Sequence, residues 1–199
     1  RKMAFVQCVG SRDENLCGNG YCSSVCCMSA IKEAVVARQQ VAGLSTAIYY
    51  MDMRTHGKEF DTYMEKAKTE HGVRFIRCRV HGVEPYSRNG DLRLHYINEE
   101  GRQVEELFDM VVLSVGLQVP RHIRELAEIA GIQISASNFA STSDFAPVTS
   151  SREGIYTCGA FSGPKGIPQC VVEGSAAAAS VAGRLRPAPS RRSLESVEE

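Results

Sequence analysis

Two kinds of hydrophobic segment alternate along the first eighty residues. Short runs rich in Val, Ile, Tyr and Phe are followed by longer stretches in which apolar residues recur every three or four positions. The short runs predict buried strands, and the longer stretches predict amphipathic helices. A strand–helix–strand–helix–strand order predicts parallel strands joined by right-handed crossovers. The five segments are residues 3–9, 24–40, 46–51, 58–70 and 73–78.

The pattern changes after residue 80 to short alternating runs separated by two turn signals, Asn89-Gly90 and Glu100-Gly101. Such runs and dipeptides are typical of hairpins, so they predict an antiparallel meander. The apolar run that follows predicts a buried strand that returns to the main sheet. The three meander strands are residues 82–84, 92–97 and 103–108, and the returning strand is 109–116.

The remaining third predicts a second α/β segment and a tail. A glycine- and proline-rich turn separates an apolar strand from a long helix that contains four consecutive alanines. The end of the chain is rich in Pro, Ser and charged residues, which predicts a disordered tail or linker. We expect the chain to be a piece of a longer polypeptide. The segments are helix 121–130, strand 154–159, turn 161–168, helix 169–185 and tail 186–199.

Composition and charge narrow the class of protein. The chain has 199 residues, is 43% hydrophobic and carries 23 basic and 23 acidic side chains. A balanced charge gives no field that draws in nucleic acid or an anionic membrane. No apolar run approaches the length of a membrane span, and no signal peptide is visible. We therefore expect a cytoplasmic protein that does not span a membrane.

Cysteines supply the strongest chemical signal. Cys8 ends the first predicted strand, and Cys22, Cys26 and Cys27 surround the start of the first helix. A disulfide between the neighbours Cys26 and Cys27 would be strained, and clustered cysteines in a reducing compartment more often bind metal or carry out redox chemistry. An iron–sulfur cubane needs four thiolates. Cys22 and Cys26 share a helix face if their turn is helical, and a helix N-terminus favours thiolates.

Other interpretations of these residues stay open. The thiols can be buried free cysteines or a structural zinc site, although the usual pair of Cys-x-x-Cys knuckles is absent. Cys17 is either a substitute ligand or a bystander. A pyridine-nucleotide site is the third alternative, because Gly18-Asn19-Gly20 lies where a dinucleotide fingerprint would lie. Its third glycine is missing and its loop is too long, and we expect Asp52 to be an exposed acid rather than a ribose ligand.

A second constellation lies between the strand that ends at Gly159-Ala160 and the helix after Gly166-Ile167-Pro168-Gln169. The free N–H groups of a helix N-terminus suit an anion, such as a reduced flavin. An ordinary strand-to-helix turn is the alternative. Lys32 lies five residues beyond Cys27, and it becomes relevant only if its helix faces a flavin, because an exposed helical lysine is otherwise commonplace.

Four segments resemble one known family. Residues 5–13 (FVQCVGSRD), 21–28 (YCSSVCCM), 30–32 (AIK) and 162–168 (SGPKGIP) resemble the A subunit of heterodisulfide reductase. They are also similar to the A subunit of the quinone-interacting membrane-bound oxidoreductase complex. The resemblance covers about residues 1–185, and the first two motifs are very specific.

The resemblance implies a fold and a domain organisation. The fold expected is a Rossmann-like, three-layer α/β fold of the FAD/NAD(P)-binding type, similar to thioredoxin reductase, with a small antiparallel meander. Residues 1–116 would be a nicotinamide-domain-like unit that carries the cysteine cluster. Residues 117–185 would be the C-terminal part of an FAD-binding domain.

The resemblance also implies roles for individual residues. Lys32 would lie near the flavin ring. The adenine-binding glycine motif of the family is absent from this chain, so we expect its FAD site to be incomplete. The expected ligands of a [4Fe-4S] cluster are Cys8, Cys22, Cys26 and Cys27. The expected flavin contacts are Gly159, Ala160, Gly166, Ile167, Pro168 and Gln169.

The function implied is electron transfer between FAD and iron–sulfur clusters in an oxidoreductase complex of the heterodisulfide reductase type. The expected partners are the other subunits of such a complex, with a hydrogenase or a dehydrogenase among the candidates, and a second copy of the chain. The chain alone is expected to be inactive.

Overall fold

A computed structural model of the protein describes residues 1–86 and 90–185. The predicted tail at 186–199 and Asn89 of the first predicted turn lie outside the described residues. The chain divides into two compact units, residues Arg1–Gln118 and a second unit that begins at Val119.

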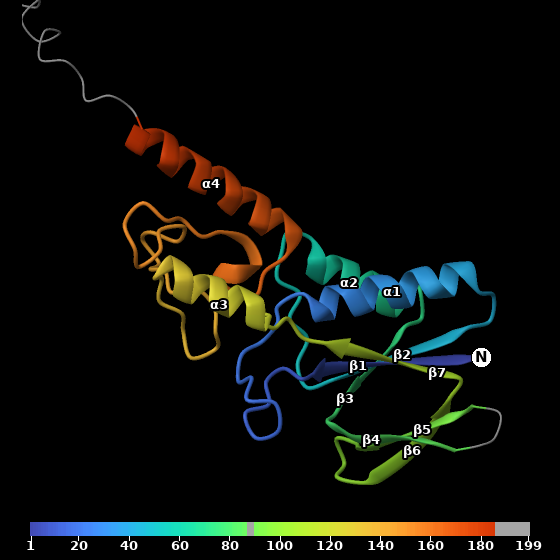
Figure 1. Ribbon diagram of the computed structural model, residues 1–199. Coiled ribbons are helices and arrows are strands. Elements are labelled where there is room, and N and C mark those ends of the chain that lie inside the picture. Colours follow the sequence, from blue (N-terminus) through green and yellow to red (C-terminus); the bar gives the residue numbers. More distant parts are fainter. Residues whose placement is uncertain (87–89, 186–199) are drawn as a thin grey trace, which may run out of the picture. The chain divides into compact units, whose positions relative to one another are not determined.

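The first unit is built on a four-stranded sheet in which every strand pairing is parallel, as predicted (Figure 1). The strand order is β3-β2-β1-β7, so the first strand of the chain is central. Phe5 of β1 lies opposite Ile48 on one side and Val112 on the other. The strands are β1 Lys2–Val9, β2 Ser45–Tyr50, β3 Arg74–Arg77 and β7 Met110–Val115.

Two helices, α1 (Cys26–Gln40) and α2 (Phe60–Thr69), cover one face of this sheet (Figure 1). The buried side chains of α1 recur at the spacing of one helical face, which explains why this segment forms a helix against the sheet. They pack around Phe5 and Ile48, which are almost fully buried. The buried positions of α1 are Cys27, Ala30, Ile31, Ala34 and Val35.

A three-stranded antiparallel meander covers the opposite face (Figure 1). Successive side chains of a strand point to opposite faces, so Ala4 and Val6 of β1 face the meander while Phe5 faces the helices. The meander contributes Leu94, Tyr96 and Phe108 to this second core. Its strands are β4 Val80–Pro85, β5 Leu92–Ile97 and β6 Gln103–Phe108.

A partly buried polar contact joins the meander to the sheet. The hydroxyl of Tyr49 donates a hydrogen bond of 2.8 Å to Oε2 of Glu106, and both terminal nitrogens of Arg74 donate to the same carboxylate at 2.6 and 3.1 Å. Burial by itself raises the pKa of Glu106, but the hydrogen bonds from Arg74 and Tyr49 hold that pKa below its usual value. The ring of Tyr49 also meets Tyr96 edge-on at 5.1 Å.

The second unit consists of two helices, a short 3-10 helix and long connecting loops. The strand predicted at 154–159 is wrong, because among the described residues this segment forms only an isolated bridge between Thr149 and Tyr156. An apolar run becomes a strand only where a neighbouring strand satisfies its backbone groups. The elements are α3 Arg121–Ala130, η1 Gly159–Ser162 and α4 Ile167–Leu185.

The starts of three helices differ from the prediction by two residues, and α2 begins at Phe60 rather than at residue 58. The first helix begins at Cys26 because Ser24 has a left-handed backbone with φ of +67°, which a right-handed helix does not accept. Cys22 therefore precedes the helix and does not share a face with Cys26. The last helix begins two residues early, at Ile167, since Pro168 is tolerated in a first helical turn.

The α/β class with a small antiparallel meander is confirmed, and the first unit has the helix–sheet–meander layers expected of it. Within the described part of the chain, no helix is both long and apolar enough to cross a membrane.

Candidate metal centre

Cys8 lies at the point of the sheet where ligands of open α/β folds usually bind. The chain crosses from β1 to β2 and β3 on one side, while β7 returns to the other side, so the strand order reverses beside β1. The pairing of β1 with β7 shifts register between Val6 and Val9, and Cys8 between them has a left-handed φ of +60°. Such bulges redirect a side chain, and left-handed non-glycine residues are enriched at functional sites.

Two buried serines close the segment that joins Cys8 to the start of α1, residues 8–25, which we call the cysteine loop. Ser11 and Ser23 share a hydrogen bond of 2.6 Å between their hydroxyls, and the N–H of Leu117 donates to Ser23 at 2.8 Å. The hydroxyl of Tyr21 donates to the carbonyl of Leu117. A Cβ at Gly116 would lie only 2.0 Å from the Ser11 hydroxyl. Both ends of the loop are thus fixed to the end of β7, which the sequence did not indicate.

The middle of this loop is a small hairpin. The backbones of Asp13 and Asn19 exchange two hydrogen bonds of 2.9 and 3.0 Å. Cys17 lies near the tip of the hairpin and is exposed. Gly18 and Gly20 therefore shape the hairpin, in the place where a dinucleotide-binding fold has its tight glycine turn.

The structure brings Cys8, Cys22, Cys26 and Cys27 together. Cys27 is buried, and the other three are half-buried. Burial, and then the charges of the other three thiolates, raise the pKa of Cys26 to about 11. Burial also raises the pKa of Cys8 and of Cys27, and the charge of Cys22 adds to both shifts. The charge of Cys22 thus influences the pKa of each of the other three thiols.

Backbone N–H groups donate to two of these sulfur atoms. The N–H of Ser24 donates to Sγ of Cys22 at 3.3 Å, and the N–H of Arg54 donates to Sγ of Cys27 at 3.5 Å. No side chain caps the N-terminus of α1, where Cys26 and Cys27 lie, so the positive end of the helix dipole faces the cysteines directly. These surroundings favour anionic sulfur.

The donor set fits a group held by four thiolates in the number, type and surroundings of its residues. In the part of the chain that the structure describes, no three or more His, Cys, Asp or Glu side chains are already arranged around a point that would hold a metal ion.

Asp52, which follows β2, is bound by two arginines. Its carboxylate forms ion pairs with Arg12 and with Arg54, the latter at 3.1 Å between Oδ2 and Nε. Although burial by itself raises its pKa, these two side chains hold the pKa of Asp52 below its usual value. Its side chain is 43% exposed, but its oxygens are not free for a ribose hydroxyl as in a dinucleotide site.

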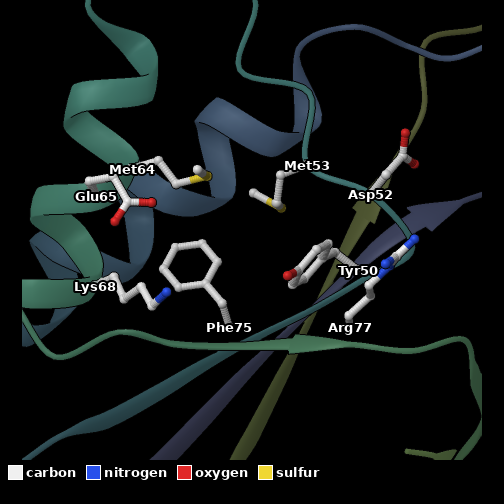
Figure 2. A pocket seen from close by; sticks show the side chains of 8 residues that line it. All are labelled: Tyr50, Asp52, Met53, Met64, Glu65, Lys68, Phe75 and Arg77. Atoms are coloured by element: carbon white, nitrogen blue, oxygen red, sulfur yellow. The ribbon is translucent and has the colours of Figure 1, made fainter. Parts of the chain in front are cut away.

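A cavity of about 340 Å³ adjoins Asp52, between α2 and the ends of β2 and β3 (Figure 2). Apolar side chains form its interior, and charged groups lie around them. It is lined by Tyr50, Asp52, Met53, Met64, Glu65, Lys68, Phe75 and Arg77.

The residues predicted to contact a flavin lie together in the second unit. Gly159 opens η1 with φ of +72°, and its N–H donates to Oε2 of Glu173 at 2.9 Å. Nζ of Lys165 lies 2.6 Å from Glu173 and 2.7 Å from the Ser162 hydroxyl, so this ion pair holds the turn closed. Sequence reasoning missed the pair, because no periodicity links its two residues. Ala160, Ile167, Pro168 and Gln169 are exposed, and Gly166 is half-buried.

Lys32 is exposed on α1. Its position near a flavin ring stays a prediction.

Comparison with known proteins identifies the class. Residues 10–180 match the family described as pyridine nucleotide-disulphide oxidoreductase. The chain belongs to this family, and the predicted oxidoreductase class is confirmed.

Particular relatives narrow the resemblance. The chain is 40% identical over 190 residues to the second iron-sulfur A subunit of the CoB–CoM heterodisulfide reductase of Methanopyrus kandleri, covering 93% of this chain and 28% of that protein. It is 37% identical over 187 residues to the A subunit of the H2:CoB-CoM heterodisulfide,ferredoxin reductase of Methanothermobacter marburgensis, covering 92% and 28%. The resemblance to the A subunit of heterodisulfide reductase is confirmed, and the chain spans little more than a quarter of these relatives' length.

A solved structure supports the fold alone. LpdA of Mycobacterium tuberculosis superposes with a TM-score of 0.56 at 18% identity, covering 92% of this chain and 34% of that one.

Proposed function

We propose that the chain is an electron-transfer part of a flavin- and iron–sulfur-dependent oxidoreductase of the heterodisulfide reductase type. Cys8, Cys22, Cys26 and Cys27 would hold a [4Fe-4S] cluster. When bound, such a cluster accepts and releases single electrons. The relative from Methanopyrus kandleri is named as an iron–sulfur protein, which agrees with this class of cofactor.

The observation that carries the proposal is the gathering of four thiols at the reversal point of the sheet. Burial, and then the charges of the other three cysteines, oppose ionisation of Cys26 and raise its pKa. Metal coordination requires deprotonated sulfur, and the positive charge of the metal would stabilise the thiolates against this opposition. The N–H donors on Cys22 and Cys27 then stabilise the anionic ligands.

The second unit would contribute to an FAD site. Its turn, which Glu173 holds closed, leads into the start of α4, and a helix N-terminus suits the negative charge of a reduced flavin. The flavin contacts would come from Gly159, Ala160, Gly166, Ile167, Pro168 and Gln169. Lys32 would provide an ammonium group near the ring. The Lys165–Glu173 pair would keep this turn in one conformation.

The complete protein would act within a complex. The relatives' names describe subunits, and one of them, from Methanococcus maripaludis, names H2 and formate. We propose that the partners are other subunits of a heterodisulfide reductase-like complex, with a hydrogenase or a dehydrogenase as the electron donor, in the cytoplasm.

Cys26→Ser tests the ligand set. The full chain is purified and reconstituted with iron and sulfide without oxygen, and its iron and visible absorbance are measured. We expect about four irons per chain before substitution and loss of most of the iron and absorbance in Cys26→Ser. The matched control is Cys17→Ser, which removes an exposed thiol at the hairpin tip and should retain both.

Metal analysis and a titration with NADH separate the alternatives. Unchanged iron in Cys26→Ser would contradict the ligand assignment. Zinc in place of iron and sulfide in the unsubstituted protein would favour a structural zinc module. Tight binding of NADH would favour the pyridine-nucleotide alternative, which the loop in place of the glycine turn and the two ion pairs of Asp52 oppose.

A further inference from the structure

One carboxylate fixes two arginines beside the cysteine site. Asp52 forms an ion pair with Arg12 from the cysteine loop and, through Oδ2, a hydrogen bond of 3.1 Å with Nε of Arg54. Arg12 itself has a left-handed backbone, with φ of +57°, and its N–H is bound to the carbonyl of Tyr21 at 3.0 Å. The loop thus fixes the backbone of Arg12, and Asp52 holds the guanidinium groups of both arginines.

The same two arginines reach the sulfur atoms. Burial raises the pKa of Cys8 and the positive charge of Arg12 opposes that shift, while Asp52 and then the charge of Cys22 raise the pKa of Arg54. The backbone N–H of Arg54 donates to Sγ of Cys27 at 3.5 Å. One candidate ligand thus receives a hydrogen bond from Arg54, two others lie within the electrostatic influence of Arg12 or Arg54, and Asp52 holds both guanidinium groups.

Charges and hydrogen bonds beside a cluster change its reduction potential. A cluster held by four thiolates becomes more negative when it gains an electron, so a nearby guanidinium stabilises the reduced form more than the oxidised form. Hydrogen bonds to the ligating sulfur atoms act in the same direction. The two arginines bring two positive charges and Asp52 one negative charge, so the group has a net positive charge beside the site.

We propose that Arg12, Asp52 and Arg54 are positioning residues that raise the reduction potential of the cluster held by the four cysteines. This inference rests on the proposed function. It concerns a property of the bound cluster, while the ligand assignment concerns whether a cluster binds at all, so the two fail separately.

A redox titration followed by electron paramagnetic resonance tests the proposal on the reconstituted full chain. Arg54→Gln should lower the midpoint potential, with a change of about tenfold in the one-electron equilibrium constant, which corresponds to about 59 mV. Arg54→Lys keeps the charge and should recover most of the shift. The matched control is Arg77→Gln, because Arg77 lines the cavity beside Asp52 but donates to the carbonyl of Met51 (Figure 2).

The outcomes are separable because iron content is measured on every variant. A full complement of iron with an unchanged potential in Arg54→Gln overturns the inference and leaves the ligand assignment intact. If Arg54→Gln loses its iron, the titration of Arg12→Gln decides instead. Loss of iron from both variants also overturns the inference, since the arginines would then serve binding. An unsubstituted chain that takes up no iron overturns the proposed function itself.

Discussion

At the scale of single residues, the cysteine loop contains several non-glycine residues with a left-handed backbone conformation. Cys8, Arg12 and Ser24 all have left-handed φ values between +57° and +67°, although none is glycine. Each such residue costs about 1–3 kcal/mol and persists only where its surroundings fix it. Here the fixed surroundings are the hydrogen-bonded pair Ser11 and Ser23 and the ion pair of Arg12 with Asp52, so the loop keeps a conformation that its residues would not adopt alone.

Gly116→Ala tests how tightly this loop is fixed. The new Cβ would lie 2.0 Å from the hydroxyl of Ser11 and 2.4 Å from that of Ser23, so both buried hydroxyls would have to move. We expect a loss of about 1–3 kcal/mol in the free energy of unfolding, measured by urea denaturation. Gly82→Ala is the control, because a Cβ there meets nothing within 4 Å. Equal stability of the two variants would contradict this account.

The cysteine pattern indicated which thiols lie near one another, because a strand end and a helix start meet in any parallel α/β unit, and their role as ligands stays a prediction. The residues that hold them in place were not predictable in the same way. Ser11, Ser23 and Gly116 are small residues that look like ordinary loop positions, and their contacts join segments about a hundred residues apart. Arg12 and Arg54 gave no local signal either, since only the fold brings them to Asp52.

At the scale of elements, the meander is joined to the sheet by one carboxylate inside an apolar contact. Leu94, Tyr96 and Phe108 supply the apolar area, while Glu106 receives hydrogen bonds from Tyr49 and Arg74. Because its folded pKa lies below its usual value, this carboxylate stabilises the protein above pH about 4.5 and loses that contribution as the pH falls through the folded pKa.

Glu106→Gln should therefore do two things. At neutral pH it should lower the free energy of unfolding by about 1.5–3 kcal/mol, the usual contribution of hydrogen bonds to a charged group. It should also reduce the fall in stability on acidification below pH about 4.5, measured as urea midpoints at several pH values. Glu105→Gln, on the same strand with a half-exposed side chain, is the control. A pH dependence equal to that of the unsubstituted chain would refute the assignment.

The elements were predicted correctly where the hydrophobic periodicity was strong. The prediction failed where a strand could form only by pairing with a neighbouring strand. The five segments up to Cys78 and the meander follow from alternation and helical spacing. The apolar run at 154–159 has the composition of a strand, but composition does not supply a pairing partner. The start of α1 depended on the backbone of Ser24, for which a serine in sequence gives no warning.

At the scale of the whole molecule, burial is unevenly distributed between the two units. Most buried apolar side chains belong to the first unit, with α1 alone burying five residues. Among the described residues, α4 buries none and α3 buries only Ala127. The described part of the second unit has few buried apolar side chains with which to resist local opening: Val119, Ala127, Phe139, Ala140 and Val148.

Hydrogen exchange of the full chain, followed by mass spectrometry, should reflect this difference. Amides of β1 and α1 should exchange most slowly, because they open only with the core of the first unit. Amides of α3 and α4 should exchange much faster, since exposed helices open locally. Protection of α4 equal to that of α1 would show that the second unit is stabilised by contacts other than its own buried side chains.

The closed base of the cysteine loop has a consequence for how related chains vary. Because Ser11 and Ser23 join the loop where it leaves and re-enters the fold, the hairpin between Asp13 and Asn19 can gain or lose residues without moving Cys8 or Cys22. The interval from Cys22 to Cys27 has no such freedom, since it leads directly into a helix. A search pattern for distant relatives should therefore allow the interval from Cys8 to Cys22 to vary in length and keep the interval from Cys22 to Cys27 fixed.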